Sequence, residues 1–153
     1  PQSQAEGRRQ TKGLITEQES IARAVVELVN GYKNKPCNCE YQHLGDKAYN
    51  LSLASMTTAP RQTVDITGGY TGEFPFALYL RTIPEDNRDR LDCEQFLSEL
   101  AAYLEQNYDA ITLADGREIE EIEQTSTPAL VGRTDDGVCD YQVILSLRYT
   151  ANQ

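Results

Sequence analysis

The chain has 153 residues, of which 24 are acidic and 14 basic, for a formal net charge of -10. This length predicts one domain with a real hydrophobic core, and an acidic surface without a basic stripe argues against direct binding of DNA or RNA. No apolar run approaches the roughly 20 residues that span a bilayer, and residues 1–6 carry no apolar signal region, so we expect a soluble protein made in the cytoplasm.

The N-terminal third begins with a polar segment and a helix. Residues 1–13 are polar and aperiodic, which predicts a flexible arm ahead of a single domain over residues 14–150. Thr16 and Glu19 form a capping box, a sequence signature of a helix start. Apolar residues then recur at helical spacing: Ile21, Val25, Leu28 and Val29. Asn30-Gly31 ends this predicted helix.

A loop is predicted over residues 32–46, and it holds Cys37, Cys39 and His43. Zinc needs four ligands and usually wider gaps between paired cysteines, and here only a nearby carboxylate could complete the set. A surface loop with chance cysteines is therefore the preferred interpretation, and we expect no metal and no cofactor. Because His43 is the only histidine in the chain, a Ser-His-Asp triad is a poor hypothesis, and we expect no catalytic residues.

Strands are predicted over residues 47–57, 63–67 and 73–83. In the first of them, apolar residues alternate with polar ones: Tyr49, Leu51 and Leu53. The glycine-rich stretch 68–72 lacks the phosphate-binding patterns and has no helix after it, so it is interpreted as a hairpin tip. Pro75 cannot donate to a strand ladder, so we place it at a strand start or on a sheet edge.

The second predicted helix spans residues 90–107, with Asp89 as its N-cap. Its apolar residues fall on one stripe: Cys93, Phe96, Leu97, Leu100 and Leu104. Cys93 lies on this stripe and Cys139 on the apolar face of a later strand, and core packing is the preferred interpretation for both thiols.

The last third is predicted to be a loop over 107–116 and then strands. Residues 117–126 are assigned to a strand, although the spacing of Ile119 and Ile122 also fits a helical turn. A solvated charged face explains the glutamates of this stretch better than a glycosidase pair or a calcium site. A short strand over 129–133, a turn over 134–137 and a final strand follow. Six residues of the final strand alternate toward one face: Cys139, Tyr141, Val143, Leu145, Leu147 and Tyr149.

The order of these elements predicts the fold class. Strand runs that are joined by tight turns imply antiparallel pairing, and two amphipathic helices must each cover apolar surface. We therefore expect an α+β fold, in which a single mainly antiparallel sheet has both helices packed on one face.

Several blocks of the chain resemble the small phage proteins known as minor capsid or tail-completion proteins, including the tail terminator group of long-tailed phages. The blocks are Phe74–Arg81, Phe96–Glu105, Thr125–Pro128, Asp136-Gly137 and Tyr141–Tyr149. The resemblance implies a non-enzymatic virion protein at the head–tail junction, assembled in the host cytoplasm. Its expected partners are further copies of itself in a ring, possibly a hexamer, the tail tube protein and the head connector protein.

The resemblance leaves the interface and two alternatives open. We expect the hairpin region 58–72 to contact a partner, and Tyr70 and Tyr79 to face outward. The residues proposed for a partner interface are Arg61, Gln62, Tyr70, Tyr79 and Arg81. One alternative is another head-completion or stopper protein. The other is a small ligand-binding or enzymatic α+β domain, for which Glu120, Tyr141 and His43 are the candidate polar groups.

Overall fold

In the computed structural model, the described residues are 17–41, 50–56, 63–64, 66 and 68–151. Several predictions fall outside this part of the chain. They concern the arm over residues 1–13, the cap residue Thr16, and His43, Tyr49, Arg61 and Gln62.

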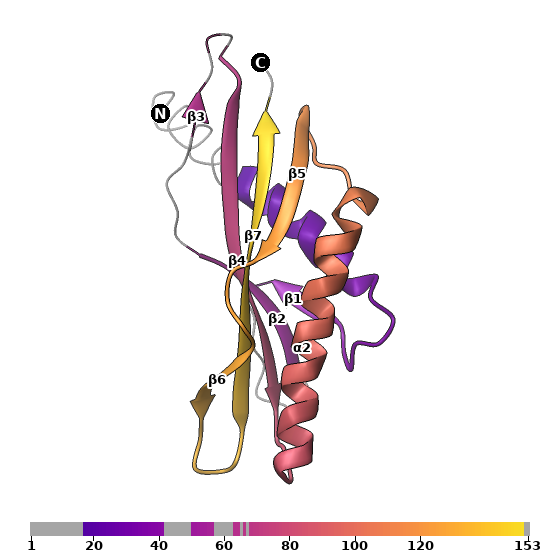
Figure 1. The fold of residues 1–153 in the computed structure, drawn as a ribbon, viewed down its shortest axis with the longest axis vertical. Coiled ribbons are helices and arrows are strands. Elements are labelled where there is room, and N and C mark those ends of the chain that lie inside the picture. Colours follow the sequence, from indigo (N-terminus) through magenta and orange to yellow (C-terminus); the bar gives the residue numbers. More distant parts are fainter. Residues whose placement is uncertain (1–16, 42–49, 57–62, 65, 67, 152–153) are drawn as a thin grey trace, which may run out of the picture.

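Two long antiparallel strands form the spine of the molecule (Figure 1). Strand β4 (Tyr70–Thr82) pairs with β7 (Cys139–Ala151) along its whole length, from Tyr70 opposite Ala151 to Thr82 opposite Cys139. The pair is twisted, so that β4 and β7 cross in this view. The alternation predicted for the final strand is confirmed, because the six apolar residues named above for that face are all buried.

Shorter strands line the outer edges of this spine. Their bounds are β1 Cys39–Tyr41, β2 Asn50–Ser55, β3 Thr63–Val64, β5 Arg117–Gln124 and β6 Ala129–Arg133. β2 and β3 pair with β4, β5 and β6 pair with β7, and β1 pairs with β2. Every pairing is antiparallel except that of β1 with β2. The predicted α+β class with one mainly antiparallel sheet is confirmed, as is the strand over the ambiguous stretch 117–126.

Both predicted helices pack on one face of the sheet. The N-terminal helix is described over residues 17–30, and α2 spans Asn87–Asn107, followed by the short 3-10 helix η1 (Tyr108–Ala110). Their apolar stripes meet the sheet in one core. Core residues from the helices include Ile21, Val25, Val29, Leu97, Leu100 and Leu104, and those from the spine include Phe74, Phe76, Leu78, Val143, Leu145 and Leu147. Among the described residues, no helix is both long and apolar enough to cross a membrane.

A polar cluster attaches the N-terminal helix to one end of the sheet. The Glu17 carboxylate oxygen Oε1 accepts hydrogen bonds from the hydroxyls of Tyr70 (2.8 Å) and Tyr149 (3.1 Å). The same oxygen lies 3.3 Å from Nε of Arg117 on β5. A partly buried carboxylate is thus compensated by one cation and two hydroxyl donors. The helix start, β4, β5 and β7 are joined at this point.

The placement predicted for Pro75 is wrong, because this residue lies in the interior of a central strand, opposite Ser146 of β7. Its carbonyl accepts a hydrogen bond from the Met56 amide (2.8 Å), so that its polar groups face the outer edge of β4. On that edge β2 pairs with residues 76–81 and β3 with residues 70–71. Pro75 faces Met56, the residue after β2, and without an N–H it cannot donate a bond in return, so the ladder between β2 and β4 ends at the pair of Ser55 and Phe76.

Three smaller predictions also need correction. Residues 70–72 are strand rather than hairpin tip, since β4 begins at Tyr70. The N-cap of α2 is Asp86, whose carboxylate accepts from the Asp89 amide (2.9 Å), so the helix begins before the predicted residue 90. The loop predicted over 32–46 contains β1, because the Asn30 side chain pairs with the backbone of Cys39 in both directions (2.7 and 3.3 Å).

Candidate functional site

Of the residues proposed for a partner interface, the three that the structure describes fall on two faces of the sheet. Tyr70 does not face outward as expected, because its ring packs against the core on the helix-bearing side and its hydroxyl donates to Glu17. Tyr79 and Arg81 lie on the opposite face of β4, which carries neither helix, and both are half-buried. The fold therefore brings Tyr79 and Arg81 together and separates them from Tyr70.

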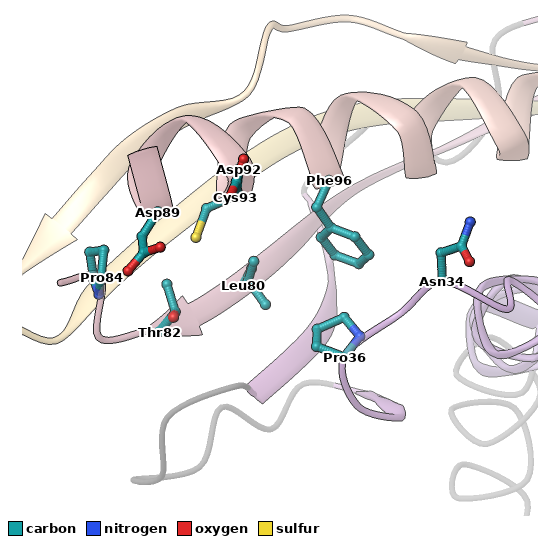
Figure 2. Close-up of a pocket in the computed structure, with 9 residues that line it drawn as sticks. All are labelled: Asn34, Pro36, Leu80, Thr82, Pro84, Asp89, Asp92, Cys93 and Phe96. Atoms are coloured by element: carbon teal, nitrogen blue, oxygen red, sulfur yellow. The ribbon is translucent and has the colours of Figure 1, made fainter. Parts of the chain in front are cut away.

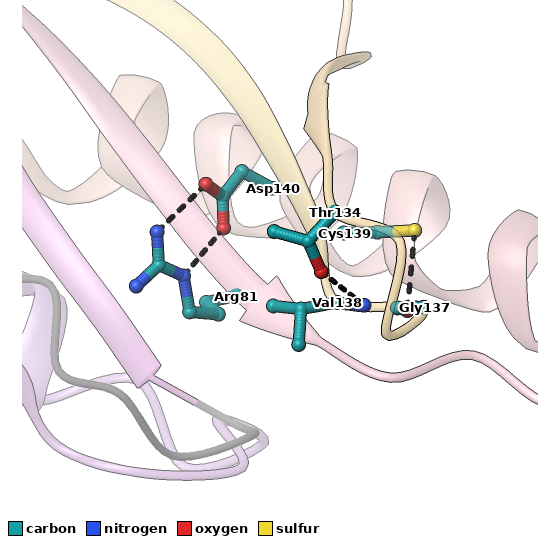
Figure 3. Close-up of polar contacts among 6 residues, drawn as sticks. All are labelled: Arg81, Thr134, Gly137, Val138, Cys139 and Asp140. Atoms are coloured by element: carbon teal, nitrogen blue, oxygen red, sulfur yellow. Dashed lines mark hydrogen bonds and ion pairs between the residues drawn. The ribbon is translucent and has the colours of Figure 1, made fainter.

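Tyr79 and Arg81 belong to a row of cross-strand pairs on the helix-free face. The Gln142 side-chain amide donates to the Tyr79 hydroxyl (2.8 Å). Arg81 makes a two-bond ion pair with Asp140, with Nε–Oδ1 at 2.8 Å and Nη2–Oδ2 at 2.9 Å (Figure 3). Such paired groups fix the register of β4 against β7. A partner on this face would meet an ordered polar surface.

Strand β6 lies at one end of the molecule (Figure 1), and it carries exposed apolar side chains. Leu130 is 45% exposed and Val131 is 52% exposed, and Arg133 two residues further on is also exposed. The ladder to β7 shifts register between Leu130 and Gly132, which marks a β-bulge at Val131. Of the strands that the structure describes, β7 is the one that pairs with β6. β6 is therefore an exposed, largely apolar edge strand.

Local hydrogen bonds hold β6 rigidly against β7. At its end, the Val138 amide donates to the Thr134 hydroxyl (3.2 Å) and the Gly137 amide to the Thr134 carbonyl (3.1 Å), which closes the hairpin (Figure 3). Gly137 has a φ of +87°, a value that favours glycine in this turn. Before β6, the Ser126 hydroxyl accepts from the Ile144 amide (2.9 Å). The edge strand is thus fixed at both ends.

A cavity of about 260 Å³ lies beside the N-terminal half of α2 (Figure 2). Its apolar lining comes from three elements: Pro36 on the loop after the N-terminal helix, Leu80 and Pro84 at the end of β4, and Phe96 on α2. The loop is held against α2 by the Tyr32 ring, whose centroid lies 6.2 Å from that of Phe96 and 5.0 Å from that of Tyr103. The cavity is therefore a consequence of how the loop docks on the helix.

The polar lining of the cavity includes two carboxylates. Asp89 and Asp92 come from the first turns of α2, and Asn34, Thr82 and Cys93 complete the set. Burial raises the pKa of the Cys93 thiol, more than its hydrogen bond with Thr82 lowers it. Cys93 therefore stays a protonated thiol at neutral pH, which is the opposite of what an activated nucleophile requires.

The remaining candidate groups are dispersed. Cys39 is 4% exposed and burial raises the pKa of its thiol to about 12, while Cys37 is half-buried. Among the described residues, no three Cys, His, Asp or Glu side chains gather as metal ligands would. Glu120 forms an ion pair with Arg148 (2.9 Å), whereas Tyr141 is 1% exposed and lies in the core. Glu120 and Tyr141 therefore do not converge on one pocket.

No model of a known protein family matches the chain, and no curated protein matches it. Among solved structures, one protein whose name describes no function is similar over 93% of this chain and 96% of its own, with 17% identity and a TM-score of 0.44. A similarity at this level carries no argument about function.

Neither the edge strand β6 nor the cavity was predicted from the sequence as a functional site. For β6 a signal was present, since Ala129, Leu130 and Val131 are consecutive apolar residues without the alternation that a half-buried strand shows. For the cavity no local signal exists, because its lining combines residues 34–36 with residues 80–96, which lie far apart in the chain. Asp89 and Asp92 resembled ordinary residues of a helix start.

Proposed function

We propose that this protein is a tail terminator-like structural protein of a long-tailed phage. In this role, copies of the chain assemble as a ring at the head–tail junction, end the growth of the tail tube and join it to the head connector. The role is non-enzymatic, and its place is the virion, after assembly in the host cytoplasm. The family resemblance of the sequence suggests the kind of assembly, and the exposed apolar edge strand β6 is the structural observation that carries the proposal.

A subunit that assembles needs a surface that keeps its structure in water and that lowers the free energy when a partner buries it. Leu130 and Val131 are about half exposed on a strand that is closed at both ends by hydrogen bonds, so they are held in place before any partner binds. Contiguous exposed apolar groups and an open strand edge are both typical of protein interfaces. The net charge of -10 is compatible with a conduit through which DNA passes without being gripped.

A second candidate function rests on the cavity beside α2. Its apolar walls and convergent polar groups fit a small-ligand site in kind, but about 260 Å³ falls below the roughly 300–1,000 Å³ usual for such sites. The protonated Cys93 thiol also argues against a nucleophilic enzyme. A stopper or other head-completion protein fits the same fold as well as a terminator does, and tube binding distinguishes these roles.

The proposal is tested by mixing the purified chain with tail tubes of its phage and imaging the tube ends by electron microscopy. We expect rings at tube ends and a halt in tube elongation. The variant Leu130→Asp should lose both effects, whereas Leu91→Asp, which changes a 65% exposed leucine on α2, should retain them. A folded chain that neither caps tubes nor limits their length would contradict the terminator role.

A further inference from the structure

We infer that neighbouring copies of the chain join by inserting Leu130 and Val131 of one copy into the cavity beside α2 of the next. This inference rests on the proposed ring, and it identifies the two surfaces from which that ring is built. The exposed part of β6, residues 129–133, is called the knob below, and the cavity between α2, the end of β4 and the loop over residues 31–38 is called the socket.

The knob has the properties of an inserted element. Its two large apolar side chains are adjacent and exposed, and the bulge at Val131 makes the strand protrude from the regular ladder. The Thr134 hydrogen bonds fix the hairpin that carries it. A rigid, preformed element loses little conformational freedom when it binds.

The socket matches the knob in size and surface. Its walls are apolar side chains from Pro36, Leu80, Pro84 and Phe96, and its volume of about 260 Å³ is small for an independent small-molecule ligand. A space of this size suits one or two aliphatic side chains. Phe96 from α2 and Pro36 from the loop both line it, so an inserted leucine would meet apolar surface from two elements (Figure 2).

Charges beside the two surfaces are complementary. Arg133 is the cation next to the apolar pair of the knob, and Asp89 and Asp92 line the socket. Complementary pairs at the edge of an interface set its register and oppose other arrangements. A second copy of this chain therefore fits the socket in charge as well as in shape.

The two surfaces belong to different parts of the molecule, as a head-to-tail contact requires. β6 pairs with the outer edge of β7, whereas the socket lies over the end of β4 and beside the loop that leads to β1. They thus lie near the same end of the long axis, where β6 and the start of α2 stand apart (Figure 1). A contact between two different surfaces of identical subunits repeats from copy to copy, and it closes into a ring when the rotation per copy allows it.

Disulfide trapping tests this arrangement directly, because Cys93 lines the socket. The variant Leu130→Cys is oxidised with diamide at mildly alkaline pH, where the introduced thiol on the exposed strand ionises and can attack. We expect covalent dimers and longer ladders on a non-reducing gel. They should disappear when Cys93→Ser is added and persist when Cys37→Ser is added instead. Ile66→Cys, a fully exposed position at the other end of the sheet, is the matched control and should give no link to Cys93.

Charge reversal gives a second measurement that does not depend on a new cysteine. Arg133→Glu and Asp92→Arg should each weaken self-association by about tenfold or more, since each places like charges in contact. An equimolar mixture of the two variants should restore it, because every contact between unlike copies is again complementary. Circular dichroism of each variant verifies that it folds.

The possible outcomes separate this inference from the proposed function. Links that need Cys93, together with restoration on mixing, support the knob and socket. If light scattering detects oligomers but no link to Cys93 forms, the knob-and-socket contact is wrong, while the proposed ring still stands. A monomer without any link also overturns the inference, and the tube-capping assay then decides independently whether the terminator role survives.

Discussion

The phenol ring of Tyr149 lies directly over Gly72 of the neighbouring central strand. The two residues are opposite one another in the ladder between β7 and β4, and a Cβ on Gly72 would approach the Tyr149 atom Cζ to 2.5 Å. The hydroxyl of the same ring donates to Glu17, which prevents the ring from moving aside without losing that bond. Any side chain at position 72 would collide with the buried Tyr149 ring, so the core requires glycine there.

Replacing Gly72 by alanine should destabilise the fold. We expect the free energy of unfolding to fall by about 1–3 kcal/mol, because the added methyl group must displace a buried ring. Urea denaturation measures the change. The matched control is Gly132→Ala on β6, where a Cβ would meet its nearest atom at 3.5 Å and the loss should be about 0.5 kcal/mol or less. Equal losses for the two variants would refute the explanation.

Asn30 should stabilise the edge strand β1. Its side-chain oxygen accepts from the Cys39 amide and its side-chain nitrogen donates to the Cys39 carbonyl, so Asn30→Ala leaves both backbone groups without this partner. We expect a loss of about 1–3 kcal/mol and faster hydrogen exchange at the Cys39 amide. Asn38→Ala, an exposed position just before β1, is the control and should change neither quantity.

The stability of the protein should decrease at alkaline pH, in part through Cys39. Burial raises the pKa of this thiol from 9.0 to about 12, so the folded state keeps a proton that the unfolded state loses above pH 9. The contribution of Cys39 is thus complete below about pH 9 and is lost as the pH rises toward about 12, at up to about 1.4 kcal/mol per pH unit. Denaturation midpoints measured across this range should fall less steeply for Cys39→Ala than for the parent chain. Parallel slopes would show that Cys39 does not contribute.

The ion pair between Arg81 and Asp140 should contribute more than an exposed pair does. Its side chains are 23% and 22% exposed and its two bonds are short, so we expect a coupling energy of about 0.5–1 kcal/mol in a double-mutant cycle of Arg81→Met and Asp140→Asn. The comparison is Arg23 with Glu19, an exposed helix pair for which about 0.3–0.5 kcal/mol is usual. A coupling near zero for Arg81 and Asp140 would mean that solvent screens this face as well.

Local patterns in the sequence were sufficient for most of the elements. The alternation from Cys139 to Tyr149 and the apolar stripe from Cys93 to Leu104 are both observed. Each pattern depends on a single segment that buries one side against the core, so it can be read from that segment alone. The α+β class followed, because two such helices and several such strands have few ways to bury their apolar sides.

Features that depend on which segments lie next to a strand could be found only in the tertiary structure. Pro75 lies in a central strand at the point where the ladder with β2 ends, and Gly72 is needed because a ring from β7 covers it. The socket likewise forms where residues 34–36 meet the much later residues 80–96. The knob is exposed because, among the described strands, β6 is paired on one side alone. Periodicity reports which face of a segment is buried, whereas pairing order and close approach are properties of segments that the chain brings together from far apart.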